Sequence, residues 1–131
     1  MKTWIGSAAV VIKEQQLLMV RMKNSQKWAV PSGEIESGES AEIACIRELY
    51  EETGYEGSII QALHTKKTTI FDYDVTTYYF LCEVVGGALT YHDPDELVEE
   101  IKWVPFEGLL QVAHEYPEDI HIIQELITKY A

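Results

Sequence analysis

The chain has 131 residues, of which 47% are hydrophobic, and a formal net charge of −12. That length suffices for one domain with a core of its own. It contains no run of about 20 apolar residues that could cross a membrane, and its acidic balance argues against a DNA-binding or acidic-membrane surface, because such surfaces are basic.

The first third of the sequence favours short strands. Ile5–Lys13 and Leu17–Met22 are rich in apolar and β-branched residues, and the polar Glu14–Gln16 between them predicts a turn. A polar loop over Lys23–Lys27 then leads to a short strand at Trp28–Val30. The next residues include proline and glycine, which end that strand.

A turn at Ser32 and Gly33 opens the most informative stretch of the sequence, GEIESGESAEIACIRELYEETGY. We predict a helix from Glu39 that ends at Gly54, since glycine is favoured just past the last turn of a helix. One side of this helix carries apolar residues that should face a core, namely Ile43, Ile46, Leu49 and Tyr50.

Three glutamates of this helix, Glu48, Glu51 and Glu52, fall within an arc of roughly 100°. Their charges repel, and a partly desolvated pair about 4 Å apart costs about 4 kcal/mol at an effective dielectric constant of about 20. A hard divalent cation, which prefers oxygen ligands, removes that repulsion. The pattern therefore predicts an Mg²⁺ or Mn²⁺ site on the helix, and the alternative is a solvated acidic face.

Two long strands are predicted after the helix, at Ser58–Thr69 and Val75–Val85, joined by Ile70–Asp74. The second of them carries consecutive apolar residues, which is typical of a strand buried on both faces. This order of strands and helices predicts an α/β fold with a mixed sheet between helices. Two further strands and two helices complete the prediction: Ala88–Tyr91, Glu99–Val104, Phe106–Ala113 and Pro117–Tyr130.

Cys45 and Cys82 are the chain's two cysteines, and they lack the spacing of a zinc site or a redox motif. We expect both to be buried and reduced, as is usual in a cytoplasmic protein.

The segment from Gly33 to Tyr55 resembles the Nudix box, the signature of the Nudix hydrolase family. The box has nine defined positions, and eight of them match this sequence. The ninth is usually aliphatic and is Tyr55 here, which we interpret as a packing variant. The flanks are also similar to the family, because Trp28–Gly33 resembles the usual lead-in and Glu100–Val104 a strand near the end of many members. Eight defined positions match, at Gly33, Glu39, Arg47, Glu48, Leu49, Glu51, Glu52 and Gly54.

This resemblance implies that residues 1–131 form a single Nudix domain, an α/β/α sandwich. It also implies that Glu48 and Glu52 bind Mg²⁺ directly, with Mn²⁺ as a substitute, and that Glu51 either binds the metal or acts through water. The backbone carbonyl of Ser32 is expected to complete the metal site. A bound metal ion would make the bridging phosphate electrophilic and lower the pKa of a water molecule.

Arg47 presents a rigid fork of donors, and its implied role is to hold a helix glutamate in place; the alternative is an exposed pair with Glu51. Glu39, at the expected helix start, is explained as well by the helix dipole as by catalysis. The implied catalytic group contains Arg47, Glu51, Glu52 and a general base. That base is either a glutamate of the box or Glu100.

Glu100 ends an acidic run, Asp93–Glu100, whose alternative explanation is an acidic surface loop. Substrate contacts should lie outside the box. Arg21 could meet phosphates or be merely exposed, and Trp28 could stack on a base or belong to the core. Tyr73, 18 residues past Tyr55, resembles a feature of dinucleoside polyphosphate hydrolases.

The resemblance implies an Mg²⁺-dependent hydrolase that cleaves a phosphoanhydride in a nucleoside diphosphate linked to another moiety. The expected partner is a small nucleotide such as an NTP or dNTP, a dinucleoside polyphosphate, or the 5′-triphosphate end of an RNA. Dimers are frequent in the family, so a homodimer stays open. The alternative is a non-catalytic Nudix-fold module that binds a nucleotide, although such modules usually lack an acid of the box.

Overall fold

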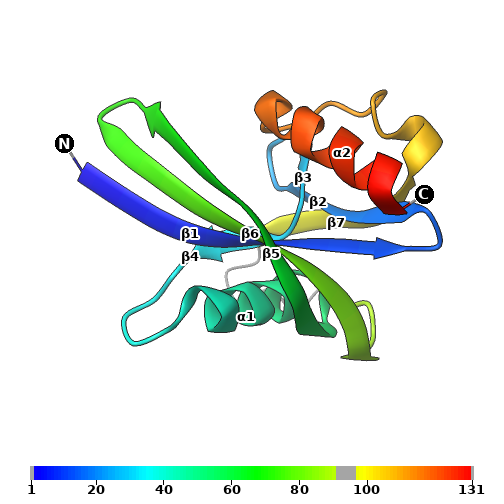
Figure 1. Cartoon of the computed structure of the whole chain (residues 1–131), viewed down its shortest axis with the longest axis horizontal. Helices are drawn as coiled ribbons and strands as arrows, with labels where there is room; N and C mark the ends of the chain where they lie inside the picture. Colours follow the sequence, from blue (N-terminus) through cyan, green and yellow to red (C-terminus); the bar gives the residue numbers. More distant parts are fainter. Residues whose placement is uncertain (1, 91–96, 131) are drawn as a thin grey trace.

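A computed structural model describes residues 2–90 and 97–130 of the chain (Figure 1). The strands and helices of this part, in chain order, are β1 (Lys2–Lys13), β2 (Gln16–Met22), β3 (Trp28–Ala29), β4 (Ser32–Glu34), α1 (Ala41–Thr53), β5 (Tyr55–Ile70), β6 (Tyr73–Gly87), β7 (Val98–Pro105), two 3-10 turns at Phe106–Gly108 and Pro117–Asp119, and α2 (Ile120–Tyr130).

The long strand β1 organises a mixed, seven-stranded sheet in the order β3-β2-β1-β6-β5. It runs parallel to β6 over most of its length and antiparallel to β2 at its C-terminal end. The short strand β4 pairs with β1, so that Ser32 lies opposite Ala8, and β7 pairs with β2. As a result, the segment entering α1 is attached to the central strand of the sheet.

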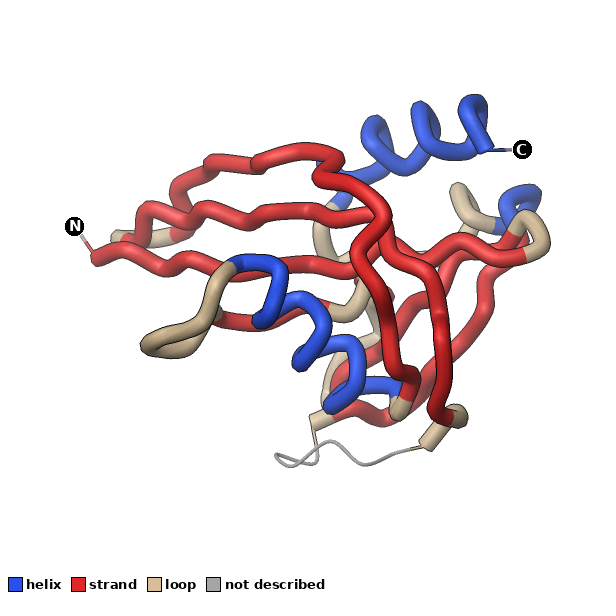
Figure 2. The backbone as a smooth tube through the Cα atoms, turned by 60° about the horizontal axis from the view of Figure 1, so that its bottom comes forward, coloured by secondary structure: helices blue, strands red, loops and turns tan. Residues whose placement is uncertain are grey.

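Two apolar layers cover the two faces of this sheet, because side chains of a strand alternate between faces. Ala8 and Val10 of β1 belong to one layer, which includes Leu126 of α2. Ala9 and Val11 belong to the other, which includes Leu49 of α1. The two helices lie on opposite sides of the strands in both views of the chain (Figures 1 and 2). The predicted α/β/α sandwich is therefore confirmed.

The cap residues of α1 set its length. The hydroxyl of Ser40 accepts a hydrogen bond from the N–H of Ile43 at 3.1 Å, so the helix begins at Ala41 rather than at Glu39. Gly54 ends the helix in the left-handed conformation, with φ 85°, as predicted.

The predicted core face of α1 was wrong for two residues, since Ile43 is 58% exposed and Tyr50 is 50% exposed. The buried face is rotated by about 100° towards the acidic side of the helix. Small residues let this face approach the sheet closely, and Glu52 lies within it. The buried residues of the helix are Ala44, Cys45, Leu49, Glu52 and Thr53.

Three further predictions need correction. Ser32 and Gly33 form strand β4 rather than a turn, because the edge of β1 offers them hydrogen-bond partners. Ala88–Thr90 is not a strand; the N–H of Thr90 instead bonds to the carbonyl of Thr53 at the end of α1. Phe106–Ala113 forms only a 3-10 turn followed by irregular turns. Residues 91–96, which include Tyr91 and most of the acidic run, lie outside the described residues.

Cys45 and Cys82 are both buried and free, as predicted, with their Sγ atoms 3.6 Å apart. Their thiols pack between α1 and β6. No helix in the described part of the chain is long and apolar enough to cross a membrane.

Candidate active site

A cavity of about 310 Å³ opens between α1 and β4, and we call it the acidic cavity. Five glutamates and one arginine contribute to its wall. Such an excess of carboxylates raises the local concentration of cations. Its lining residues are Met22, Ser32, Gly33, Glu34, Glu36, Arg47, Glu48, Glu51, Glu52 and Leu97.

Gly33 allows the backbone of β4 to lie directly against a carboxylate of α1. A Cβ atom at this position would overlap the carboxyl group of Glu48. Because Gly33 has no side chain, the carboxyl group of Glu48 has room beside it. Glycine is required here for this steric reason and not for its backbone conformation.

Arg47 links the carboxylates at the mouth of this cavity. Its guanidinium donates to both oxygens of Glu39, at 2.6 and 2.8 Å, and to Glu48 Oε1 at 2.8 Å. It also donates to Glu51 Oε2 at 3.2 Å and to the carbonyl of Glu34 at 3.0 Å. The expected pairing of Arg47 with a helix glutamate is thus present, and it extends to Glu39 just before the helix.

Glu52 is the most deeply placed of the three predicted helix ligands, at 5% exposure. Its Oε1 accepts a long hydrogen bond of 3.4 Å from the N–H of Ser32. Glu51 lies closer to the mouth of the cavity, where burial raises the pKa of its carboxyl group, with a further rise from Glu48 and an opposing effect of Arg47. Burial in the cavity therefore favours the protonated form of Glu51.

Glu39→Gln should make the stability of the protein less sensitive to acid. Hydrogen bonds from Arg47 and from the N–H of Glu36 lower the pKa of Glu39 from 4.5 to about 2. A carboxyl group whose pKa falls on folding stabilises the protein above pH 4.5, and this contribution is lost as the pH falls through about 2. Urea unfolding across that window should show a shallower loss of unfolding free energy in the variant. Equal slopes for the two proteins would contradict the role of Glu39.

The residues of the acidic cavity fit a divalent cation. Among the described residues, no three acidic, histidine or cysteine side chains already stand as a set of metal ligands. Glu48 and Glu51 are instead paired with Arg47. The donor set is nevertheless all oxygen, as hard cations prefer. The space that Gly33 leaves for the Glu48 carboxyl group also keeps that group beside the backbone of β4. Glu48, Glu51 and Glu52 are the side chains that could hold such an ion.

The structure does not bring the other predicted site residues into this cavity. Arg21 Nη2 pairs with Glu100 Oε1 at 3.3 Å, directly across β2 and β7. Trp28 is buried in the apolar layer on the α2 side, with the Arg21 guanidinium carbon 5.9 Å from its ring centre. Tyr73 lies at the far end of the β5–β6 hairpin, beside Lys2. Tyr55, the variant position of the box, accepts a hydrogen bond from Trp103 at 3.2 Å.

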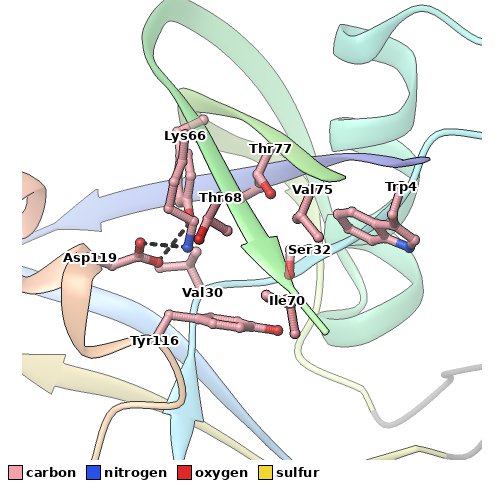
Figure 3. Close-up of a pocket in the computed structure, with 12 residues that line it drawn as sticks. Trp4, Val30, Ser32, Lys66, Thr68, Ile70, Val75, Thr77, Tyr116 and Asp119 are labelled. Carbon is pink, nitrogen blue, oxygen red and sulfur yellow. Dashed lines mark hydrogen bonds and ion pairs between the residues drawn. The ribbon is translucent and has the colours of Figure 1, made fainter. Parts of the chain in front are cut away.

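A second cavity, of about 320 Å³, lies on the α2 side of the sheet and shares Ser32 with the acidic cavity (Figure 3). We call it the apolar pocket. Four of its polar residues were not predicted from the sequence, namely Lys66, Tyr79, Tyr116 and Asp119. The only local signal was Pro117, which is favoured in a first helical turn and so places Asp119 at a helix start. Its lining residues are Trp4, Ala8, Val30, Ser32, Lys66, Thr68, Ile70, Val75, Thr77, Tyr79, Tyr116 and Asp119.

Comparison with known proteins gives a family match. Residues 3–126 match the NUDIX domain family model. The chain is 44% identical over 83 residues to a Bacillus subtilis protein named "Putative 8-oxo-dGTP diphosphatase". The matched segment is 63% of this chain and 54% of that protein. It is 38% identical over 91 residues to "Putative mutator protein MutT4" of Mycobacterium tuberculosis, over 63% of this chain and 34% of that protein. The chain thus spans about a third to about half of these relatives.

Solved structures show the same fold. A NUDIX hydrolase from Nitrosomonas europaea superposes with a TM-score of 0.82 at 23% identity, covering 98% of this chain and 90% of that one. A UDP-X diphosphatase superposes with a TM-score of 0.84 at 17% identity, covering 100% and 66%.

Proposed function

We propose, on the premise that this chain belongs to the NUDIX domain family, that it hydrolyses a phosphoanhydride bond of a nucleotide in the acidic cavity. The observation that carries the proposal is the placement of Glu48, Glu51 and Glu52 in one cavity, held by Arg47 and backed by Gly33. Arg47, Glu48, Glu51 and Glu52 are all present and line one cavity, which supports a hydrolase over a module that only binds a nucleotide.

A divalent ion, which we propose to be Mg²⁺ with Mn²⁺ as a substitute, would supply charge neutralisation at the phosphates and a lowered pKa of water. Glu48 and Glu52 would hold it. Glu51 is better placed than Glu100 to take a proton from the attacking water, because Glu51 lines the cavity and its pKa is raised. Glu100 is paired with Arg21 instead.

Arg47 would act by positioning rather than by contact with substrate. Its guanidinium fixes Glu48 and Glu51 relative to Glu39, which stands outside the helix. Carboxylates held in fixed positions would keep a bound ion in one geometry, and such preorganisation is a large contribution to catalysis.

For the substrate class, we propose a nucleoside triphosphate or a deoxy counterpart. The name of the B. subtilis relative as an 8-oxo-dGTP diphosphatase supports this choice. A second feature supports it too, because the apolar pocket next to the acidic cavity is large enough for a base and sugar rather than for phosphate alone.

The proposal predicts hydrolysis of members of a panel of NTPs, dNTPs, dinucleoside polyphosphates and 5′-triphosphorylated RNA. Attack of water on phosphorus would release phosphate or pyrophosphate from a triphosphate or from the RNA end, and two nucleotides from a dinucleoside polyphosphate. Activity should require Mg²⁺ or Mn²⁺ and disappear with EDTA, since the carboxylates cannot neutralise phosphate charge on their own. Product analysis by chromatography checks this. Nucleotide binding without turnover of any member would instead favour a non-catalytic binding module.

A further inference from the structure

The two walls of the acidic cavity, α1 and β4, are both attached to one short stretch of β1 (Figure 1). On the β4 side, Ser7 lies opposite Gly33 and Ala8 lies opposite Ser32 in an antiparallel pair. Strand β4 has three residues, and in the described part of the chain it pairs with β1. The position of this wall is therefore set by β1.

Two hydrogen bonds attach the other wall, α1, to the same two residues of β1. The Ser7 hydroxyl donates to the carbonyl of Ala41, the first residue of α1, at 2.7 Å. The Cys45 thiol donates to the carbonyl of Ala8 at 3.6 Å, and it can donate to Cys82 instead. Because a thiol is a weak donor, the Ser7 hydroxyl is the stronger of the two attachments.

The residues of α1 that meet β1 and β4 form one stripe along the helix. Spacings of four, three and four residues place them within an arc of roughly 60°. The first two are bonded to β1, and the carboxylates of the last two lie against β4. A shift or rotation of α1 on β1 would therefore move both carboxylates relative to β4. The members of the stripe are Ala41, Cys45, Glu48 and Glu52.

Ser7 contacts both walls from a fully buried position. It is 0% exposed, its backbone pairs with Gly33, and its side chain donates to α1. A buried hydroxyl needs a hydrogen-bond partner, which the Ala41 carbonyl provides. Apolar contacts such as those of Leu49 have no preferred direction, whereas an O–H···O bond restricts both distance and angle. The Ser7 hydroxyl can thus fix where α1 lies on the sheet.

We infer that Ser7 is a positioning residue of the acidic cavity. Its hydroxyl sets the position of α1 on β1, and thereby the position of Glu48 and Glu52 relative to β4. Ser7 acts through the helix, because it does not itself line the cavity. The consequence for a divalent ion and for hydrolysis rests on the proposed function, whereas the attachment of α1 to β1 does not.

Ser7→Ala removes the hydroxyl and should lower the affinity for Mn²⁺ by about tenfold, the scale of losing a residue that supports metal ligands. For a nucleotide that is hydrolysed, kcat should fall by about 10- to 100-fold, since a displacement of about 1 Å is costly on that scale. KM should change little, because the Ser7 side chain faces α1 rather than the apolar pocket. Electron paramagnetic resonance of Mn²⁺ and steady-state kinetics measure these effects.

Ser40→Ala is the matched control, the same substitution at the residue just before Ala41. The Ser40 hydroxyl accepts from the N–H of Ile43, so it bonds within the helix rather than between helix and sheet. Each variant loses one hydrogen bond at the start of α1, and the two losses of stability should be similar in scale. Mn²⁺ affinity should stay at the wild-type value in Ser40→Ala. Should Ser7→Ala not fold, Ser7→Cys, which keeps a weaker donor, replaces it in the comparison.

Amide hydrogen exchange in EDTA tests the attachment without metal or substrate. Exchange in Ser7→Ala should be faster along α1 as far as Glu52, by about fivefold relative to β6, the factor that corresponds to one hydrogen bond. In Ser40→Ala the increase should be confined to the first turn.

The two measurements separate this inference from the hydrolase proposal. If the wild type neither binds Mn²⁺ nor hydrolyses a nucleotide, the proposed function fails, and the exchange pattern decides the inference. Faster exchange along the whole of α1 in Ser7→Ala supports it, and unchanged exchange there would overturn it. If the wild type does bind Mn²⁺, equal affinities of Ser7→Ala and Ser40→Ala would overturn it as well.

Discussion

Glu52→Gln should lower kcat by about 10³-fold while the protein stays folded, which is the scale expected when a main electrostatic contact of a reaction is lost. Glutamine keeps the size of the side chain and an oxygen that can accept from the N–H of Ser32. It removes the negative charge from the most deeply placed acid of the cavity, and that charge is what a divalent ion needs. Steady-state kinetics at saturating substrate measures the effect.

The matched control for this prediction is Glu42→Gln. Glu42 lies on the same helix, is exposed, and does not line the acidic cavity. The Glu42→Gln substitution also removes one negative charge from α1. Any general effect of the charge of the helix, or of the net charge of −12, therefore appears in both variants. Activity of Glu52→Gln within about tenfold of Glu42→Gln would exclude Glu52 from the electrostatic role assigned to it.

Arg47→Met should destabilise the protein by about 3–5 kcal/mol, because removing one partner of a largely buried charge network leaves the other charges uncompensated. Glu39, Glu48 and Glu51 all lose their donor, and their side chains are only 14%, 14% and 29% exposed. Urea unfolding measures the loss. Arg47→Lys should recover part of it, since lysine restores the charge but not the planar fork that reaches several acids at once.

The same variant provides a readout that a merely structural role of Arg47 would not give. Without the guanidinium, Glu48 and Glu51 repel each other, and a divalent ion should take over the neutralisation. Added Mg²⁺ should therefore stabilise Arg47→Met more than it stabilises the wild type, through preferential binding to the folded state. If Mg²⁺ stabilises the variant no more than the wild type, Arg47 does not compete with the ion for Glu48 and Glu51.

The sequence specified the acidic cavity better than it specified the buried face of the helix that forms it. The spacing of the box located Glu48, Glu51 and Glu52 correctly on one side of α1. It could not show that Ile43 and Tyr50 face solvent, because the buried face depends on where the sheet lies. A prediction from apolar periodicity assigns only hydrophobic residues to the buried face. It therefore could not place Glu52, a charged residue that is buried, on that face.

Residues that meet only through the tertiary fold were beyond the reach of spacing arguments. Lys66 and Asp119 are 53 positions apart, and Arg21 and Glu100 are 79 apart. The first pair becomes the polar side of the apolar pocket. The second pair arises from the register of β2 and β7. Glu100, one of the two alternatives for the general base in the sequence analysis, is therefore paired outside the acidic cavity.

Direct detection of a bound ion tests the central claim, that the acidic cavity is a divalent-metal site. Electron paramagnetic resonance of Mn²⁺ titrated into the wild type, Glu52→Gln and Glu42→Gln reports the free ion. We expect saturable binding by the wild type and by Glu42→Gln, with an affinity at least about tenfold lower in Glu52→Gln because a charged ligand is lost. Equal Mn²⁺ binding by all three proteins would contradict it.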